Sequence, residues 1–161
     1  MSQTNELEIM ERIALDLEGV EESLASSFNT GAEDFNALIR PLSAAGGKRL
    51  RAQLCLLIAN AGTSVERQRI RIAEAVEMLH LATLIHDDVL DQAEIRRGEE
   101  TIHMHKGNKV AILSGDYLFA KAFQIVSEMP NMKYLQVFSH IITCLVEGEF
   151  MQMEDVYRID Q

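Results

Sequence analysis

The chain has 161 residues, of which 47% are hydrophobic and 25% charged, and its formal net charge is −10. This composition is typical of one globular domain that can bury a core, and it excludes an intrinsically disordered chain. The acidic balance argues against nucleic acid as a partner, because the phosphate backbone attracts basic proteins.

Apolar residues recur at helical spacing along the chain, and alternating strand patterns are missing. We therefore expect a single all-α domain over residues 1–161, with about six helices. The expected helices cover residues 5–27, 33–40, 48–61, a segment from Thr63 or Ser64 to Asp91, 109–127 and 132–156. Pro41 is expected to end the second helix, because proline lacks a backbone N–H. Residues 92–106 are expected to form a polar loop.

Redox and targeting features favour a cytoplasmic protein. Cys55 and Cys144 lie among apolar residues without metal-ligand spacing, so we expect two buried free thiols. The N-terminus is acidic where a signal peptide is basic. No apolar run approaches the roughly 18 residues of a membrane span, so we expect no transmembrane segment.

The most informative segment runs from His86 to Gly98 and contains three aspartates followed by two arginines. Asp87, Asp88 and Asp91 are expected to project from one end of one helix face, where the helix dipole is mildly unfavourable for acids. Carboxylates so arranged suit Mg²⁺, which commonly bridges one or two of them to substrate phosphates. The arginines suit the same polyanion. A solvated acidic helix end is the plain alternative, and the adjacent arginines weigh against it.

A basic segment points to the same kind of ligand. Residues 46–71 carry six basic residues and one acid, whereas residues 1–34 carry nine acids and one base. A glycine pair precedes Lys48, and Lys48 and Arg51 are expected to share one face at a helix N-terminus, which favours an anion. The spacing is not that of a P-loop. His80 lies two turns before Asp87 on the same side of the expected helix. Both a core histidine and a ligand-contacting histidine fit this position.

Together these segments resemble the trans-type isoprenyl diphosphate synthases, or polyprenyl synthetases. The resemblance runs from about residue 35 to 155 and rests on Gly46–Arg51, Glu77–Asp91, Arg96–Gly98, Gly115–Leu118 and Glu147–Gln152. It implies half of the isoprenoid-synthase helical bundle, around a deep cavity. It also implies that isopentenyl diphosphate is joined to an allylic diphosphate, with Mg²⁺ as cofactor.

The resemblance implies a role for each motif residue. Asp87 and Asp91 are expected to coordinate Mg²⁺ on the allylic diphosphate, with Asp88 supporting them. Arg96 is expected to contact the same diphosphate. The residues expected to hold isopentenyl diphosphate are Lys48, Arg51, His80 and Arg97, and Gln152 lies in a further substrate-binding segment. Ala82 and Thr83 are small side chains one turn before the aspartates, which indicates a medium- or long-chain product, with Val76 and Leu79 limiting the depth below them.

The family's second aspartate-rich motif is missing from the sequence. Glu154, Asp155 and Asp160 come nearest to it but lack its spacing. Three explanations are open: a subunit whose partner chain supplies the second motif, a truncated piece of a longer synthase, and a non-catalytic regulatory subunit. The intact motifs favour the first. Terpene cyclases are an alternative class, but they do not bind isopentenyl diphosphate and do not need Lys48, Arg51 and His80 together.

The apolar sides of the last two helices predict a partner. Without a second half, part of the apolar surface of residues 109–127 and 132–156 has nothing to pack against, and such patches mark interfaces. Mutual burial of the two helices accounts for some of this surface. We expect a hetero-oligomer, and a heterotetramer where the helix at 109–127 also makes the family's homodimer-like contact.

Overall fold

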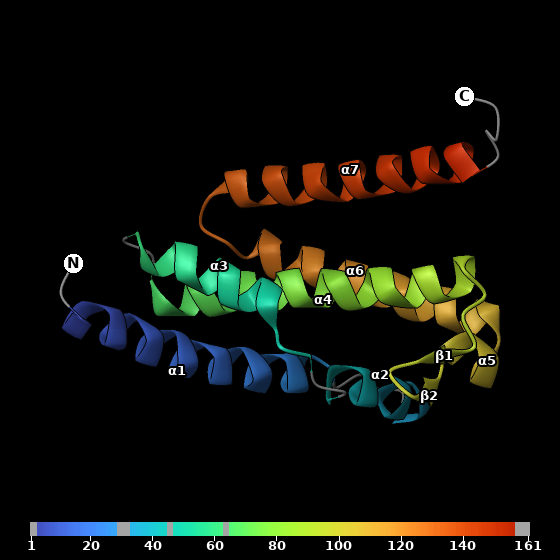
Figure 1. Ribbon diagram of the computed structural model, residues 1–161, viewed down its shortest axis with the longest axis horizontal. Helices are drawn as coiled ribbons and strands as arrows, with labels where there is room; N and C mark the ends of the chain where they lie inside the picture. The colour runs from blue at the N-terminus through green and yellow to red at the C-terminus, as the bar shows by residue number, and fades with distance from the viewer. Residues whose placement is uncertain (1–2, 29–32, 45–46, 63–64, 157–161) are drawn as a thin grey trace.

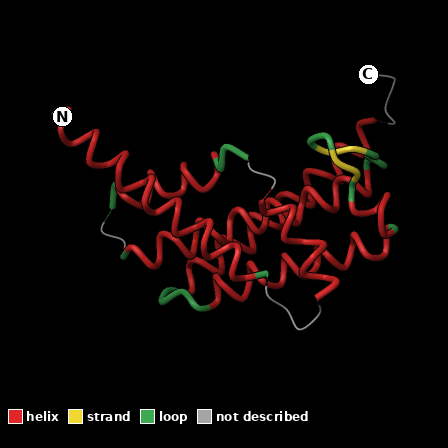
Figure 2. Tube along the Cα trace, turned by 90° about the horizontal axis from the view of Figure 1, so that it is seen from below, coloured by secondary structure: helices red, strands yellow, loops and turns green. Residues whose placement is uncertain are grey.

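The computed structural model describes residues 3–28, 33–44, 47–62 and 65–156 (Figure 1). Its elements are α1 (Gln3–Ser27), α2 (Glu33–Ala44), α3 (Leu50–Asn60), α4 (Glu66–Leu90), β1 (Ile95–Arg96), β2 (Glu99–Glu100), α5 (Ile102–Lys106), α6 (Asn108–Ser127) and α7 (Met132–Val156). The part of the chain that the structure describes is thus seven helices and one short antiparallel hairpin, which lies at the opposite end from the N-terminus (Figure 2). The expected all-α class is confirmed.

α4 is the central helix and packs against α1, α3 and α6 (Figure 1). Three of its alanines, Ala73, Ala75 and Ala82, are completely buried, and their short side chains let neighbouring helices approach closely. Larger apolar side chains from the surrounding helices fill the space between them. The fully buried ones include Val20 and Leu24 of α1, Phe28 directly after it, Leu56 of α3 and Leu118 of α6. This core fixes the position of the aspartate segment at the end of α4.

α7 forms a separate layer on the outside of α6 (Figure 1). Phe138 is its buried anchor and packs edge to face on Phe123, with ring centroids 5.5 Å apart. Several other apolar side chains of α7 are between 42% and 66% exposed, and they include Val137, Ile141, Leu145, Val146, Phe150 and Met151. The expected uncovered apolar surface is therefore present, while Leu118 and Phe138 are among the side chains that the two helices bury.

Pro41 does not end α2, contrary to the expectation from the sequence. The helix continues to Ala44, because a proline in the last turn removes only its own N–H bond, and Leu42 packs on the core beyond it. The expected helix start at Thr63 or Ser64 lies outside the described residues, as do Gly46 and Asp160. α4 itself begins at Glu66.

Residues 92–106 are not a plain loop. β1 and β2 pair through Arg96 and Glu99, and the two residues between them, Arg97 and Gly98, have φ values of 54° and 87°. Positive φ at both central positions is what a type I′ hairpin turn requires. The α5 helix follows the hairpin. Strands of two residues are too short to leave an alternating pattern in the sequence.

Two further expectations change. Cys144 is exposed rather than buried, because α7 packs on α6 along one side only, whereas Cys55 is half-buried and burial raises the pKa of its thiol. α6, which the sequence analysis did not single out as a candidate span, is long and apolar enough to cross a membrane by length and composition alone. The core helix of a soluble protein passes the same test, and α6 packs against α4, α5 and α7.

Candidate functional site

The three aspartates at the end of α4 point to two different sides. Asp87 lines a cavity between α4, α6 and α7, whereas Asp88 is buried on the other side of the helix and accepts a hydrogen bond of 2.6 Å from Arg96 Nε. Asp91 is exposed at the helix end. Successive helix residues are about 100° apart, so neighbouring aspartates cannot share one face. The expectation of a single three-carboxylate face is therefore wrong for Asp88.

Asp87 lies in a negatively charged environment. Burial, together with the carboxylates of Glu149 and Asp91, raises the pKa of Asp87 above its usual value. Arg96 opposes this effect. Where like charges gather without full compensation, a cation stabilises all of them. Within the described residues no three potential ligands form a complete metal centre, but Mg²⁺ needs only one or two carboxylates when substrate phosphates and water supply the rest.

The cavity beside Asp87 has a mostly apolar lining with a few charged and ionisable side chains. Its volume is about 570 Å³. The ionisable lining residues include Arg51, His80, Asp87 and Glu149, which come from α3, α4 and α7. The apolar lining consists of Leu84, Leu90, Phe119, Ile142, Leu145, Val146, Phe150 and Met153. A cavity of this kind fits an amphiphile that has a highly charged head and a hydrocarbon tail.

Basic groups lie close together around His80. Arg51 Nη1 lies 3.1 Å from Nε2 of His80, and burial, then Arg51, lowers the pKa of His80, with Arg97 and Arg96 contributing less. A neutral His80 therefore accepts the arginine hydrogen bond. Arg97 lies against the basic segment, since a Cβ placed on Gly47 would lie 3.3 Å from its Nη2.

Lys48 and Arg51 were expected to share one helix face, but they do not. α3 begins only at Leu50, and Arg49 before it has the left-handed backbone values φ 46° and ψ 38°. Lys48 is exposed in the segment that leads into the helix. Arg51 thus lines the cavity from the first turn of α3, whereas Lys48 lies in the preceding turn and is not a lining residue.

The contact of α4 with α6 depends on a glycine. His86 lies over Gly115, so close that a Cβ there would lie only 2.2 Å from His86 Nε2. That nitrogen is 3.1 Å from the carbonyl oxygen of Ile112 and 3.5 Å from Asp116 Oδ1. The segment around Gly115 therefore positions the aspartate end of α4 by close packing.

Comparison with known proteins agrees with this geometry. The model of the polyprenyl synthetase family matches residues 32–161. The chain belongs to the polyprenyl synthetase family. It is 34% identical over 148 residues to octaprenyl diphosphate synthase of Escherichia coli, covering 92% of this chain and 46% of that protein. It is 39% identical over 147 residues to heptaprenyl diphosphate synthase component 2 of Geobacillus stearothermophilus, covering 91% of this chain and 46% of that protein.

Solved structures show the same fold. The polyprenyl synthase of Caulobacter crescentus, crystallised with calcium and isoprenyl diphosphate, superposes with a TM-score of 0.83 and 35% identity, over 89% of this chain and 45% of that one. The expected half of the isoprenoid-synthase bundle is thus confirmed. The chain spans about half the length of the curated relatives it matches.

The polyprenyl synthetase motifs predicted only part of the cavity lining. Among the residues expected to set chain length, Thr83 lines the cavity, whereas Ala82 and Leu79 are buried in the core and Val76 lies outside the lining. Gln152 is exposed and is not a lining residue, although Glu149, Phe150 and Met153 of the same helix are. Leu84 and Phe119 were missed. Leu84 lies one helical turn before Asp87, a spacing that was available in the sequence.

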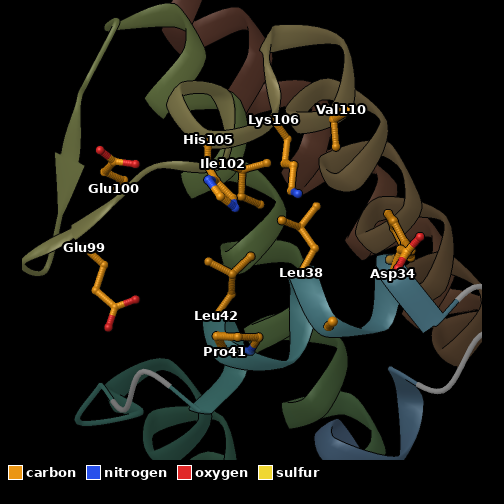
Figure 3. Close-up of a pocket in the computed structure, with 12 residues that line it drawn as sticks. Asp34, Leu38, Pro41, Leu42, Glu99, Glu100, Ile102, His105, Lys106 and Val110 are labelled. Carbon is orange, nitrogen blue, oxygen red and sulfur yellow. The ribbon is translucent and has the colours of Figure 1, made fainter.

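A larger cavity lies elsewhere and fits a diphosphate poorly. It has a volume of about 850 Å³ and is formed by α2, β2, α5 and the start of α6 (Figure 3). Three carboxylates line it, those of Asp34, Glu99 and Glu100, against one lysine, Lys106. None of the motif residues lines it. The candidate substrate site is therefore the smaller cavity at the aspartate end of α4.

Proposed function

We propose that this chain forms the diphosphate-binding half of a prenyltransferase site, in which isopentenyl diphosphate condenses with an allylic diphosphate to give a medium- or long-chain polyprenyl diphosphate. The observation that carries the proposal is that Asp87, Arg51 and His80 line one cavity whose remaining lining is mostly apolar, with Arg51 in contact with His80. Relatives named for octaprenyl and heptaprenyl products support the product class.

The residues of the site suit this chemistry. Breaking the allylic C–O bond leaves negative charge on the departing diphosphate, and Mg²⁺ held by Asp87 and Asp91 would neutralise it. Arg96 is proposed to contact this diphosphate from its place beside Asp88. Arg51, Lys48, His80 and Arg97 are proposed to orient isopentenyl diphosphate. The apolar lining excludes water, so that the carbocation meets the double bond and not a water molecule.

The second wall of the cavity is proposed to come from a partner chain that carries the other aspartate motif. The exposed apolar side chains of α7 support this arrangement, because they border the cavity and need a cover. The relative named as component 2 of heptaprenyl diphosphate synthase is compatible with an enzyme of several chains. A heterotetramer, with α6 at a contact between like subunits, and a cytoplasmic location are parts of the same proposal.

The proposal is tested by incubating the chain with Mg²⁺, farnesyl diphosphate and labelled isopentenyl diphosphate, with and without a candidate partner. Longer labelled diphosphates that form only with the partner are the expected result. Cyclic hydrocarbons formed without isopentenyl diphosphate would instead indicate a terpene cyclase. No product under any condition, while the partner binds tightly, would indicate a regulatory subunit.

The arrangement of the chains needs a separate measurement. Immunodetection in the source cells is expected to find that this polypeptide elutes with a second helical protein that carries the other aspartate motif. A native polypeptide about twice as large would show that the second wall belongs to the same chain.

A further inference from the structure

A buried ion cluster joins the basic segment to α1 and α4. Arg49 Nε and Nη2 donate to the carboxylate of Glu21 at 2.6 and 3.1 Å, and Arg49 Nη1 donates to Glu77 Oε2 at 3.3 Å. The side chains of Arg49 and Glu77 are only 7% and 5% exposed. The other oxygen of Glu77 accepts a hydrogen bond of 3.0 Å from the backbone N–H of Ala52. None of these residues was among the predicted site residues.

Glu77 replaces the usual cap of α3. The N-terminal N–H groups of a helix are ordinarily satisfied by the side chain of the capping residue itself. Here the capping residue is Arg49, whose side chain makes no capping hydrogen bond, and Glu77 reaches across from α4 to bind the N–H of Ala52 in the first turn. A left-handed backbone at a non-glycine residue is unfavourable, so Arg49 keeps it only where its surroundings hold it.

The cluster sets the distance between the basic residues and α4. Lys48 and Arg51 flank the Arg49 turn, and Glu77 lies one helical turn before His80, which Arg51 contacts at 3.1 Å. One carboxylate therefore fixes both the backbone of the basic segment and its position relative to the histidine. Removing the negative charge of Glu77 would leave Arg49 paired with Glu21 of α1 alone and allow the turn to relax away from α4.

We propose that Glu77, acting through Arg49 and the N–H of Ala52, is a positioning residue that holds Arg51 beside His80, and fixes the turn that carries Lys48, for diphosphate binding. This inference rests on the proposed function, because it assigns the cluster to the diphosphate site. Glu77 itself does not touch the ligand. Its carboxylate acts on the anion site indirectly, by holding Arg49 and the N–H of Ala52. Glutamine in its place keeps the size of the side chain but loses the charge that pairs with Arg49.

α4 offers a matched control. Glu74 lies three residues earlier, is completely buried, and accepts hydrogen bonds from Ser23, Ser27 and Arg71. Those contacts fasten α1 to α4 and involve no residue of the 47–51 segment. Glu74→Gln therefore removes a buried carboxylate from the same helix without disturbing the Arg49 turn.

The test measures binding of inorganic pyrophosphate with Mg²⁺ to the full chain by calorimetry. We expect Glu77→Gln to weaken binding by about tenfold, as loss of an outer supporting contact commonly does, and Glu74→Gln to change it less than about twofold. Hydrogen exchange without ligand should speed up at the amides of residues 50–53 in Glu77→Gln only. Arg49→Lys serves where Glu77→Gln does not fold, and it should also weaken binding, because lysine lacks the forked donors.

The outcomes separate the two proposals. Wild-type chain that binds no pyrophosphate would overturn the proposed function and this inference together. Wild-type binding that is unchanged in Glu77→Gln and Arg49→Lys, or equally reduced in Glu74→Gln, would overturn the inference alone and reduce the cluster to a support of the fold.

Discussion

Two groups of carboxylates on α4 differ in how their charge is balanced. Glu74 and Glu77, in the middle of the helix, are buried and satisfied by arginine, serine and backbone donors. Asp87, near the end of the helix, faces Glu149 and Asp91, and burial with these neighbours raises its pKa. A fold selected for stability alone would compensate the second group as it does the first. The proposed function accounts for the difference, because a cation bound with the diphosphate would compensate the charge at the helix end.

The largest expected effect is on Asp87. Asp87→Asn should weaken binding of Mg²⁺ and pyrophosphate by about 100-fold, because losing a charged contact to an ionic ligand costs about 2–5 kcal/mol. Calorimetry on the purified chain measures this loss. The matching variant Glu74→Gln should bind normally.

The same variant should stabilise the free protein. The folded-state pKa of Asp87 is raised, so its favourable contribution is present below the unfolded pKa and is lost as pH rises through the folded pKa. At neutral pH the charged carboxylate of Asp87 therefore lowers the free energy of unfolding, and Asp87→Asn removes this charge. Urea unfolding without metal should show higher stability for Asp87→Asn and lower stability for Glu74→Gln. A loss of stability in both would mean that Asp87 has a structural role.

Gly115 tests how tightly the helix end is held. Gly115→Ala places a Cβ where His86 now lies, and overpacking of this kind costs about 1–3 kcal/mol. Denaturant unfolding measures the cost. The double variant Gly115→Ala with His86→Ala should recover part of it, whereas additive losses would show that the two residues do not compete for the same space.

His80 predicts a pH dependence. Its pKa is lowered in the folded chain, so its contribution to stability is present above its ordinary value of 6.5 and is lost as pH falls through the folded pKa. A bound diphosphate should raise that pKa, so binding should take up protons at pH values between the pKa of His80 in the free chain and its higher pKa in the complex. Calorimetry in buffers of different ionisation enthalpy detects the uptake, and His80→Gln should abolish it.

The smallest effect concerns product length. Thr83→Phe places a large ring in the cavity and should shorten the product of the assembled enzyme by a few isoprene units. Ala82→Phe should lower stability and leave product length unchanged in the folded fraction, because Ala82 is in the core. Chromatography of labelled products distinguishes the two. An equal shortening by both would place Ala82 in the cavity wall.

Much of the fold could be predicted because helical spacing dominates the sequence. The long helices and the family followed from periodicity and ordered motifs. The hairpin could not be predicted, because its strands are two residues long and its turn depends on Arg97 in a left-handed conformation. The extension of α2 past Pro41 depends on packing of Leu42, which local sequence does not report.

The sequence predicted which residues form the candidate site better than it predicted how they are arranged. The motifs named Asp87, Arg51 and His80, which the structure brings to one cavity. They did not show that Asp88 turns away to Arg96, since adjacent aspartates look equivalent in a sequence. Glu149 and Phe119 reach the cavity from other helices, and only tertiary structure places them there. The Arg49 cluster was hidden for the same reason, because basic residues in a row do not reveal which one is buried.

The most direct test of the central claim is to locate a bound metal. Crystals of the chain grown with Mn²⁺ and inorganic pyrophosphate, measured near the manganese absorption edge, show the metal by its anomalous signal. The account predicts a peak beside Asp87 and Asp91, with the pyrophosphate between it and Arg51. A peak elsewhere, for example in the cavity of Asp34, Glu99 and Glu100, with Asp87 left without metal, would contradict it.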